Sequence, residues 1–164
     1  MSKPTYSYVR SKVAPDAVGC ILVIGDTASP VSYTVVGETK NIDGPALKGE
    51  TTDVTNTQSP GGVKEFKRTL TDPGEVTCSV NYVPSDPGQE ACQAALSAGG
   101  DTILPFQIWE PESGIVSPTN TTPGWWELYG AVVEFSVTRP LEKEPVVAIK
   151  IKVSGLPVYT PESA

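Results

Sequence analysis

The chain has 164 residues, a formal net charge of −7 and no histidine. A net negative charge argues against a nucleic-acid-binding protein that is held by phosphate contacts. Without histidine, the commonest general base and the commonest metal ligand are missing, together with the catalytic triads and dyads built on them. We therefore expect no enzyme, no cofactor and no metal site.

Composition and cysteine usage indicate a single β-rich domain. The 15 glycines and 16 prolines indicate many turns, and the chain is long enough to bury a hydrophobic core. No stretch approaches the roughly 20 apolar residues of a membrane span, and the N-terminus shows no apolar segment of a secretion signal. The cysteines have no paired spacing, so we expect reduced and mostly buried thiols at Cys20, Cys78 and Cys92.

The first third of the chain predicts an arm followed by short strands. Residues 1–16 mix serine, tyrosine, proline and charge, which predicts a flexible arm. The apolar run 18–24 predicts a strand buried on both faces, and residues 31–36 predict a second strand. Residues 42–45 indicate a turn. The threonine-rich run 47–57 then predicts a strand with polar surroundings on at least one face.

A long connection follows this polar strand. Residues 58–73 contain two flexible breaks, Pro60-Gly61-Gly62 and Asp72-Pro73-Gly74. Because the segment is longer than most connections between strands, we predict a long inter-strand loop with a use of its own. The loop carries apolar and cationic side chains, namely Val63, Lys64, Phe66, Lys67, Arg68 and Leu70.

Residues 75–82 show the clearest alternation in the sequence and predict a strand with two different faces. The apolar face consists of Val76, Cys78, Val80 and Tyr82. The polar face consists of Glu75, Thr77, Ser79 and Asn81. Two interpretations fit this pattern: an outer strand of a monomeric sandwich, or a strand whose polar face lines a water-filled channel.

One helix separates two β-rich halves. Asp86 suits the N-cap, Pro87 suits the first helical position, and Gly99 suits the C-terminal stop. The sequence therefore predicts a helix over about 86–98. Its packing side is expected to consist of Cys92, Leu96 and the alanines between and beside them.

The last third predicts three strands and a tail. Residues 102–109 predict a strand that Pro105 assigns to an edge or a bulge. Residues 125–138 predict the longest strand, and alternation over 146–154 predicts the last one. Residues 159–164 are expected to form a C-terminal tail.

Charge is distributed unevenly along the chain. No lysine or arginine occurs from Thr69 to Thr138, whereas cations gather in 64–68 and in 139–152. This pattern fits an ordinary solvated surface, and it also fits a molecule whose complementary faces associate head to tail.

The order and character of these elements resemble the tail tube proteins of long-tailed, siphovirus-like bacteriophages. The resemblance extends from Leu47 to Val158 and includes the polar strand, the long loop, the alternating strand and the helix. It ends with Trp126-Glu-Leu-Tyr-Gly130 and the closing strand. It implies a β-sandwich or split barrel with one flanking helix, formed by a single tail-tube-like domain over 17–158.

The resemblance also implies hexameric rings that stack into a tube, with a polar, acidic lumen through which DNA passes during ejection without specific binding. The lumen is expected to be lined by Glu50, Thr52, Glu75, Thr77, Ser79 and Asn81. The long loop is expected to join one ring to the next through Val63, Lys64, Phe66, Lys67, Arg68 and Leu70. The implied partners are further copies of the chain and tail terminator, tape measure and tail-tip proteins, with no membrane contact. Such a protein is assembled in the host bacterial cytoplasm and located in the virion tail.

An immunoglobulin-like binding or adhesin module is the alternative function. It would use Trp125, Trp126 and the proline-rich loop 110–124 to contact a ligand. A tryptophan pair more often starts a strand, with one ring in the core and the other at an edge or interface.

Overall fold

The computed structural model describes residues 20–100, 102–110 and 124–161. These residues form a mainly β structure with one α-helix, as the sequence predicts. The strands and helices are β1 (Ile21–Gly25), β2 (Tyr33–Val35), β3 (Thr39–Asp43), β4 (Lys48–Asp53), the 3-10 turn η2 (Pro60–Gly62), β5 (Phe66–Asp72), β6 (Glu75–Asn81), α1 (Pro87–Ala98), β7 (Leu104–Trp109), β8 (Trp125–Thr138) and β9 (Val146–Thr160).

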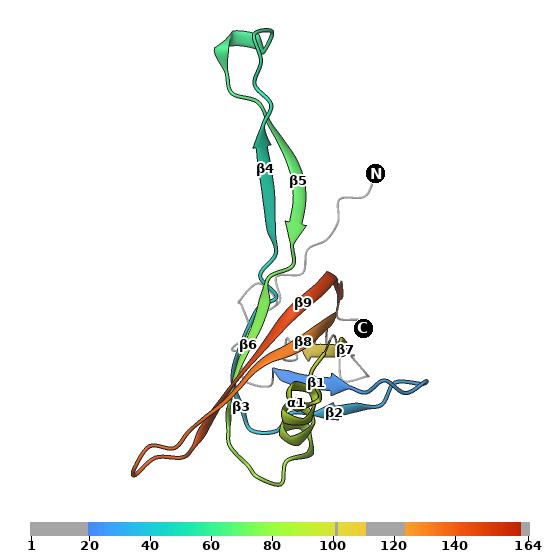
Figure 1. The fold of residues 1–164 in the computed structure, drawn as a ribbon, viewed down its shortest axis with the longest axis vertical. Coiled ribbons are helices and arrows are strands. Elements are labelled where there is room, and N and C mark those ends of the chain that lie inside the picture. The colour runs from blue at the N-terminus through green and yellow to red at the C-terminus, as the bar shows by residue number, and fades with distance from the viewer. Residues whose placement is uncertain (1–19, 101, 111–123, 162–164) are drawn as a thin grey trace, which may run out of the picture.

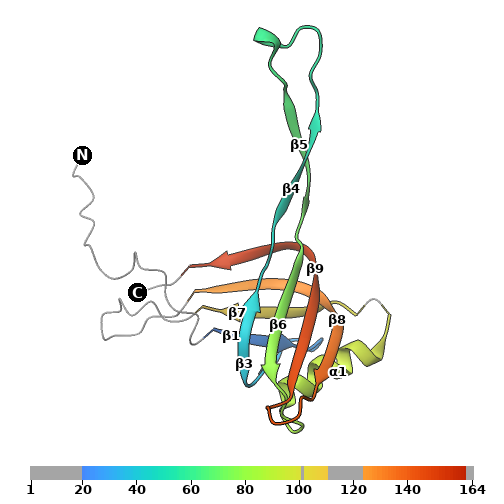
Figure 2. The same ribbon diagram turned by 90° about the vertical axis from the view of Figure 1, so that its left-hand side faces the viewer.

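Seven strands form one antiparallel sheet in the order β2-β1-β7-β8-β9-β6-β3. The sheet is strongly curved, and the long strands β8 and β9 bend through both of its halves (Figure 1, Figure 2). Its concave face and α1 enclose the hydrophobic core, in which Leu22, Val76, Phe106, Leu128 and Ile151 are at most 1% exposed. The expectation of a mainly β fold, a β-sandwich or split barrel with one flanking helix, is confirmed.

The two edge strands of this sheet, β2 and β3, are joined by only three residues, 36–38. The Val36 amide donates to the Leu22 carbonyl (2.9 Å) and so extends the pairing of β2 with β1. The Asn81 amide donates to the Glu38 carbonyl (2.9 Å) and so extends the pairing of β3 with β6. Because one short corner serves both edges, the sheet must curl until its two ends meet.

The N-terminus of α1 holds this corner. The Asp86 carboxylate caps the helix at the Gln89 amide (2.9 Å) and also accepts from the Gly37 amide (3.2 Å). The Gln89 carboxamide is 1% exposed and accepts from the Val83 amide at 3.1 Å. It donates to the carbonyls of Gly37 (3.2 Å) and Asn81 (2.8 Å). A Cβ at Gly37 would overlap the Asp86 carboxylate, so only glycine permits this approach.

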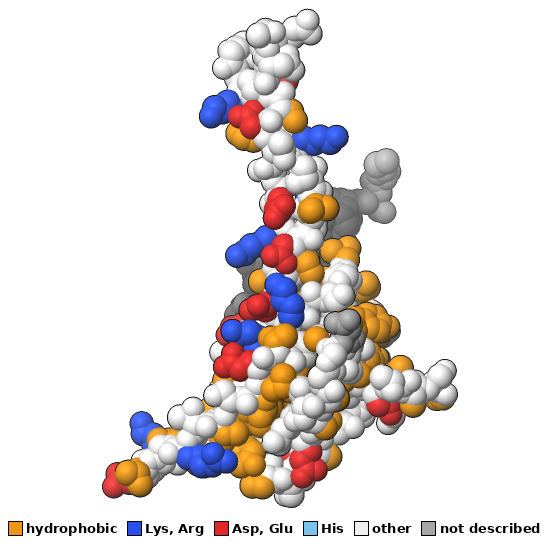
Figure 3. Space-filling view, viewed as in Figure 1, with side chains coloured by type: hydrophobic (Ala, Val, Ile, Leu, Met, Phe, Trp, Pro, Cys, Tyr) orange, Lys and Arg blue, Asp and Glu red, His pale blue; other side chains and the backbone are white. Residues whose placement is uncertain are grey.

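The other two strands, β4 and β5, form a separate hairpin that projects far from the sheet (Figure 1, Figure 3). The sequence predicts a loop over 58–73, and this is wrong for the second half of the segment. Residues 66–72 are the strand β5, paired with β4, and only 54–65 form the connection. The sequence does not reveal this pairing, because β5 is exposed on both faces and therefore shows no alternation of apolar and polar residues.

Two further strand assignments differ from the sequence-based expectations. β7 is central rather than at an edge, because it lies between β1 and β8. Pro105 is accommodated as the second residue of β7, before pairing with β1 begins at Phe106. β9 continues to Thr160, past the predicted end of this strand at residue 154, because its end pairs with Trp125.

The helix begins and ends where the sequence predicts, but its packing side differs. Cys92 is fully buried, and Ala91 and Ala95 pack against the core. Leu96 is 37% exposed, so the expectation that it packs into the core is wrong. The buried stripe follows Gly88, Gln89 and Cys92 instead, and the last turn of the helix lies at the surface.

We expect Gln89→Leu to destabilise the subunit by about 3 kcal/mol, because it leaves buried backbone groups without partners. Leu96→Ala is expected to cost less than about 1 kcal/mol, because this side chain is already partly in water. Urea unfolding of the two variants measures the difference. Equal losses would show that the corner does not depend on Gln89.

The buried thiols predict a loss of stability at alkaline pH. Burial raises the pKa of Cys78 and of Cys92 to about 12. In an unfolded chain the pKa of a cysteine thiol is about 8.5. The folded state therefore holds more protons than the unfolded state above this pH, and stability falls as the pH rises. Thermal melts between pH 8 and 10 should show a smaller fall for the Cys78→Ala, Cys92→Ala double variant. An unchanged pH dependence of the melting temperature would show that these two thiols do not cause the loss of stability.

Candidate assembly surfaces

The convex side of one half of the sheet is polar. In β6, Val76, Cys78 and Val80 are 0%, 3% and 0% exposed and face the core. The alternate residues therefore face away from the core, as the sequence predicts. They are Glu75, Thr77, Ser79 and Asn81.

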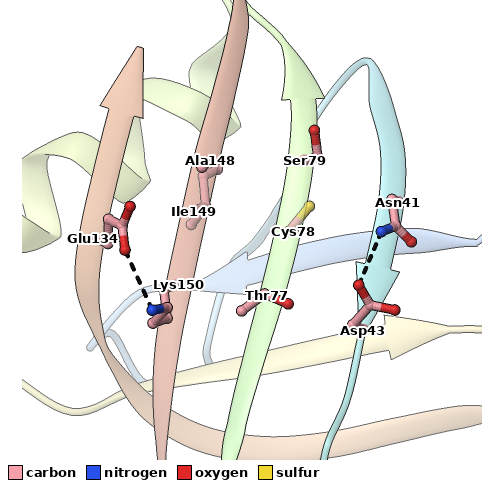
Figure 4. Close-up of a pocket in the computed structure, with 9 residues that line it drawn as sticks. All are labelled: Asn41, Asp43, Thr77, Cys78, Ser79, Glu134, Ala148, Ile149 and Lys150. Carbon is pink, nitrogen blue, oxygen red and sulfur yellow. Dashed lines mark hydrogen bonds and ion pairs between the residues drawn. The ribbon is translucent and has the colours of Figure 1, made fainter. Parts of the chain in front are cut away.

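The strands beside β6 extend this polar face. Thr77 pairs with Asp43 of β3 on one side and with Lys150 of β9 on the other. Ser79 lies in the same way between Asn41 and Ala148. Together with Glu134 of β8, these side chains surround an open depression of about 250 Å³ (Figure 4). We call the convex side of β3, β6, β9 and the C-terminal half of β8 the polar face.

The lysines of the polar face lie beside carboxylates. The Lys150 ammonium is 3.4 Å from Glu134 Oε2. The Lys152 ammonium is 3.9 Å from Glu75 Oε1 and 4.0 Å from Asp72 Oδ1. Alternation over 146–154 already indicates that both lysines face outward, but the sequence does not reveal that they share a surface with Glu75.

Asn81, a member of the predicted lumen set, is half-buried. Its Oδ1 atom is buried and has no hydrogen-bond partner among the described residues. The residue lies at the end of β6, where its backbone is engaged by Gln89 and Glu38. Thr77 and Ser79 are half-buried as well, and Glu75 is the exposed residue of this strand.

Glu50 and Thr52 do not lie beside these residues. They belong to β4, whose partner is β5, whereas the neighbours of β6 are β3 and β9. Glu50 and Thr52 therefore lie on a separate hairpin and not in the sheet that contains Glu75, Thr77, Ser79 and Asn81. Polar residues on both faces of β4 reflect a hairpin that is surrounded by solvent, not the lining of the sheet.

The hairpin formed by β4, β5 and their connection has exposed apolar side chains. Val63, Phe66 and Leu70 are 65%, 61% and 71% exposed. The connection is nevertheless ordered by hydrogen bonds, because the Val54 amide donates to the Glu65 carbonyl (2.9 Å) and the Ser59 hydroxyl donates to the Glu65 carboxylate (2.8 Å). The cations of the hairpin are exposed as well, namely Lys64, Lys67 and Arg68.

Two strand edges border the polar face. β3 pairs only with β6, and β8 beyond Gly130 pairs only with β9 in the part of the chain that the structure describes. Each edge presents backbone groups that another strand can satisfy. The polar face is therefore open at both sides.

The aromatic residues of the alternative binding module are used within the sheet. Trp125 stacks on Trp109 with 5.0 Å between ring centroids, and Trp126 packs against Tyr159 at the same distance. Residues 111–123 of the proline-rich loop and the N-terminal arm 1–16 lie outside the described residues.

Within the described ranges, no group of histidine, cysteine and carboxylate side chains is arranged to hold a metal ion. The helices found there are also too short or too polar to cross a membrane.

No family model and no curated protein sequence matches this chain. Several solved structures are nevertheless similar in fold. One is a chain from the tail of an empty gene transfer agent particle with C6 symmetry, at 14% identity and a TM-score of 0.59, covering 85% of this chain and 95% of that chain. Another belongs to the sheath–tube complex of an extracellular contractile injection system, at 10% identity and a TM-score of 0.64, covering 92% and 95%.

The SPP1 tail tube is also similar, at 13% identity and a TM-score of 0.58, covering 88% of this chain and 78% of that chain. At these identities the likeness concerns the fold, and it extends over most of each chain. The described chain therefore has the fold found in phage tail tubes and related injection tubes, as the resemblance in sequence order implies.

Proposed function

We propose that this chain is the structural subunit of a virion tail tube, in which hexameric rings stack and the polar faces of all subunits line the channel. The observation that carries this proposal is the polar face bordered by two unpaired strand edges, β3 and the C-terminal half of β8. A sheet that is polar on one side and open at both edges is suited to continue into a copy of itself.

Ring closure follows from these edges. We assign the contact between neighbouring subunits to β3 of one copy and residues 131–138 of β8 in the next, which pair through their backbones. Such pairing satisfies the free amide and carbonyl groups of both edges and joins the polar faces into one barrel. The gene transfer agent tail of the same fold has C6 symmetry, which supports a ring of six.

Stacking follows from the direction of the hairpin. β4 continues from β3 and β5 leads into β6, so the hairpin prolongs two strands of the polar face beyond the end of the sheet (Figure 2). Strands that line a channel run along it, and their prolongation therefore reaches toward the next ring. The exposed apolar residues Val63, Phe66 and Leu70 are then available for a contact between rings.

The charge pattern of the polar face suits a channel for DNA. Asp43, Glu75 and Glu134 outnumber Lys150 and Lys152, so the face is weakly acidic. Each lysine also lies beside a carboxylate, which lowers its capacity to capture a phosphate. DNA is thus expected to pass without specific binding.

The proposed role is structural rather than enzymatic, and its place is the virion tail. The subunit would be made in the host bacterial cytoplasm and assemble there with further copies of itself. Tail terminator, tape measure and tail-tip proteins are the expected partners at the two ends and inside the tube.

We expect Phe66→Ser combined with Leu70→Ser to abolish tubes but not rings. Both side chains are exposed in the subunit, so its unfolding free energy should change by no more than about 0.5 kcal/mol. Negative-stain microscopy distinguishes rings from tubes, and urea unfolding verifies the fold. Tubes of normal length from this double variant would exclude the hairpin from stacking.

We expect tubes of the Glu75→Gln, Glu134→Gln double variant to retain double-stranded DNA that wild-type tubes release. Lys150 then loses its neighbouring carboxylate and Lys152 keeps only Asp72. Retention should weaken with added salt as phosphate contacts do. Sedimentation of tubes with labelled DNA at several salt concentrations measures the effect. Glu144→Gln in the exposed β8–β9 connection is the control and should leave retention unchanged. Equal retention by both variants would contradict a channel lined by the polar face.

A further inference from the structure

A groove lies between α1 and the β1–β2 corner. Its volume is about 300 Å³, and one wall consists of Ala91, Ala94 and Ala95. Ile24 and Leu104 form part of its lining and are only 3% and 9% exposed, because they belong to the hydrophobic core. The groove is therefore an opening at the edge of the core, kept free by three small side chains of one helix.

A carboxylate is fixed at this groove. Asp26 lines it, and Asp26 Oδ1 accepts hydrogen bonds from the amides of Ala28 and Ser32, each at 3.0 Å. These bonds hold the β1–β2 turn, so the negative charge has a defined position. Glu90 adds a second exposed carboxylate on the first turn of α1, one residue before the alanine wall begins.

We propose that this groove receives the β4–β5 hairpin of a subunit in the neighbouring ring. The inference rests on the proposed tube function and names the surface on which one ring stacks upon the next. The occupant is a second copy of this chain, with the apolar side chains of its hairpin, led by Phe66, entering the groove. Lys64, Lys67 and Arg68 of the same hairpin then lie near Asp26 and Glu90.

The positions of the two surfaces support this assignment. The hairpin extends from one end of the molecule along its longest axis, and α1 with the neighbouring groove lies toward the opposite end (Figure 1, Figure 2). Subunits repeated along this axis therefore bring the hairpin of one copy to the groove end of the next. A contact between two different surfaces of the same chain repeats without closing, which is the requirement for a stack of rings.

The chemistry of the two surfaces is complementary as well. Over residues 63–70 of the hairpin, the exposed cations Lys64, Lys67 and Arg68 outnumber the one carboxylate, Glu65, and accompany exposed apolar groups. The groove has an apolar floor and the carboxylate of Asp26 in its lining. Apolar groups supply the affinity of such a contact, and opposite charges fix its register and increase its rate of formation. This contact would also explain why cations gather in 64–68 while the segment that contains α1 has none.

The first experiment compares Ala94→Lys with Gln93→Lys. Both changes add one cation to an exposed position of α1, but only residue 94 lines the groove. Ala94→Lys places a long, positive side chain where the hairpin enters, so we expect the protein concentration needed for tube formation to rise about tenfold or more. Gln93→Lys is expected to change it less than about twofold. Equal assembly of the two variants would overturn the proposal.

A mixing experiment tests the same contact independently of any single substitution. Rings of Ala94→Lys retain an intact hairpin, and rings of the Phe66→Ser, Leu70→Ser variant retain an intact groove. At protein concentrations at which neither variant forms tubes, each variant alone should remain as single rings. The mixture should form ring pairs and no tubes, because only one ring-to-ring interface then combines intact hairpins with intact grooves. A mixture that contains single rings only would overturn the groove assignment.

Assembly of the wild-type chain shows whether a negative result concerns the groove contact or the tube function itself. If the wild-type chain forms no rings, the tube function itself fails. If wild-type tubes form and the Ala94→Lys variant also forms tubes at the wild-type concentration, the tube function stands and the hairpin binds elsewhere.

Discussion

The corner at residues 36–38 is the constraint on which the rest of the structure depends. It joins both edge strands of a seven-stranded sheet, and the helix N-terminus fixes it through Asp86 and Gln89. The Gln89 carboxamide has three backbone partners, and the residue is 1% exposed. Because an unpaired amide in this position would cost free energy, the network strongly favours one arrangement of sheet and helix.

Curling of the sheet separates two chemical environments on the same strands. β6 and residues 146–153 of β9 alternate between core-facing and solvent-facing residues, and the solvent-facing ones lie on the convex side of the sheet. The two register shifts in β8 accompany its bend. At Gly130, a Cβ would lie 2.7 Å from the carbonyl oxygen of Lys152. Glycine therefore allows β8 and β9 to pair closely at this position.

Placing the hairpin and the groove toward opposite ends makes the molecule directional. The cations of 64–68 are carried away from the body by β4 and β5, whereas Lys150 and Lys152 are held at the polar face by neighbouring carboxylates. The two basic clusters of the sequence therefore have different environments. One is available to another subunit, and the other is balanced within the sheet.

The sequence by itself determined the elements that carry a strong local signal. The alternation of 75–82 fixed which side of β6 is buried, and Asp86, Pro87 and Gly99 fixed the helix, because capping and period-two patterning act over a few residues. Only the tertiary structure decided which strands pair and which side of the helix packs against the sheet. β4 and β5 have no buried face to pattern their sequence, so their pairing and the isolation of Glu50 and Thr52 from β6 could not be predicted. Pro105 lies in a central strand because pairing with β1 starts one residue later, and Leu96 is exposed because the helix leaves the sheet at its last turn. The groove beside Ala94 likewise depends on Ile24 and Leu104, which only the closed sheet brings to the helix.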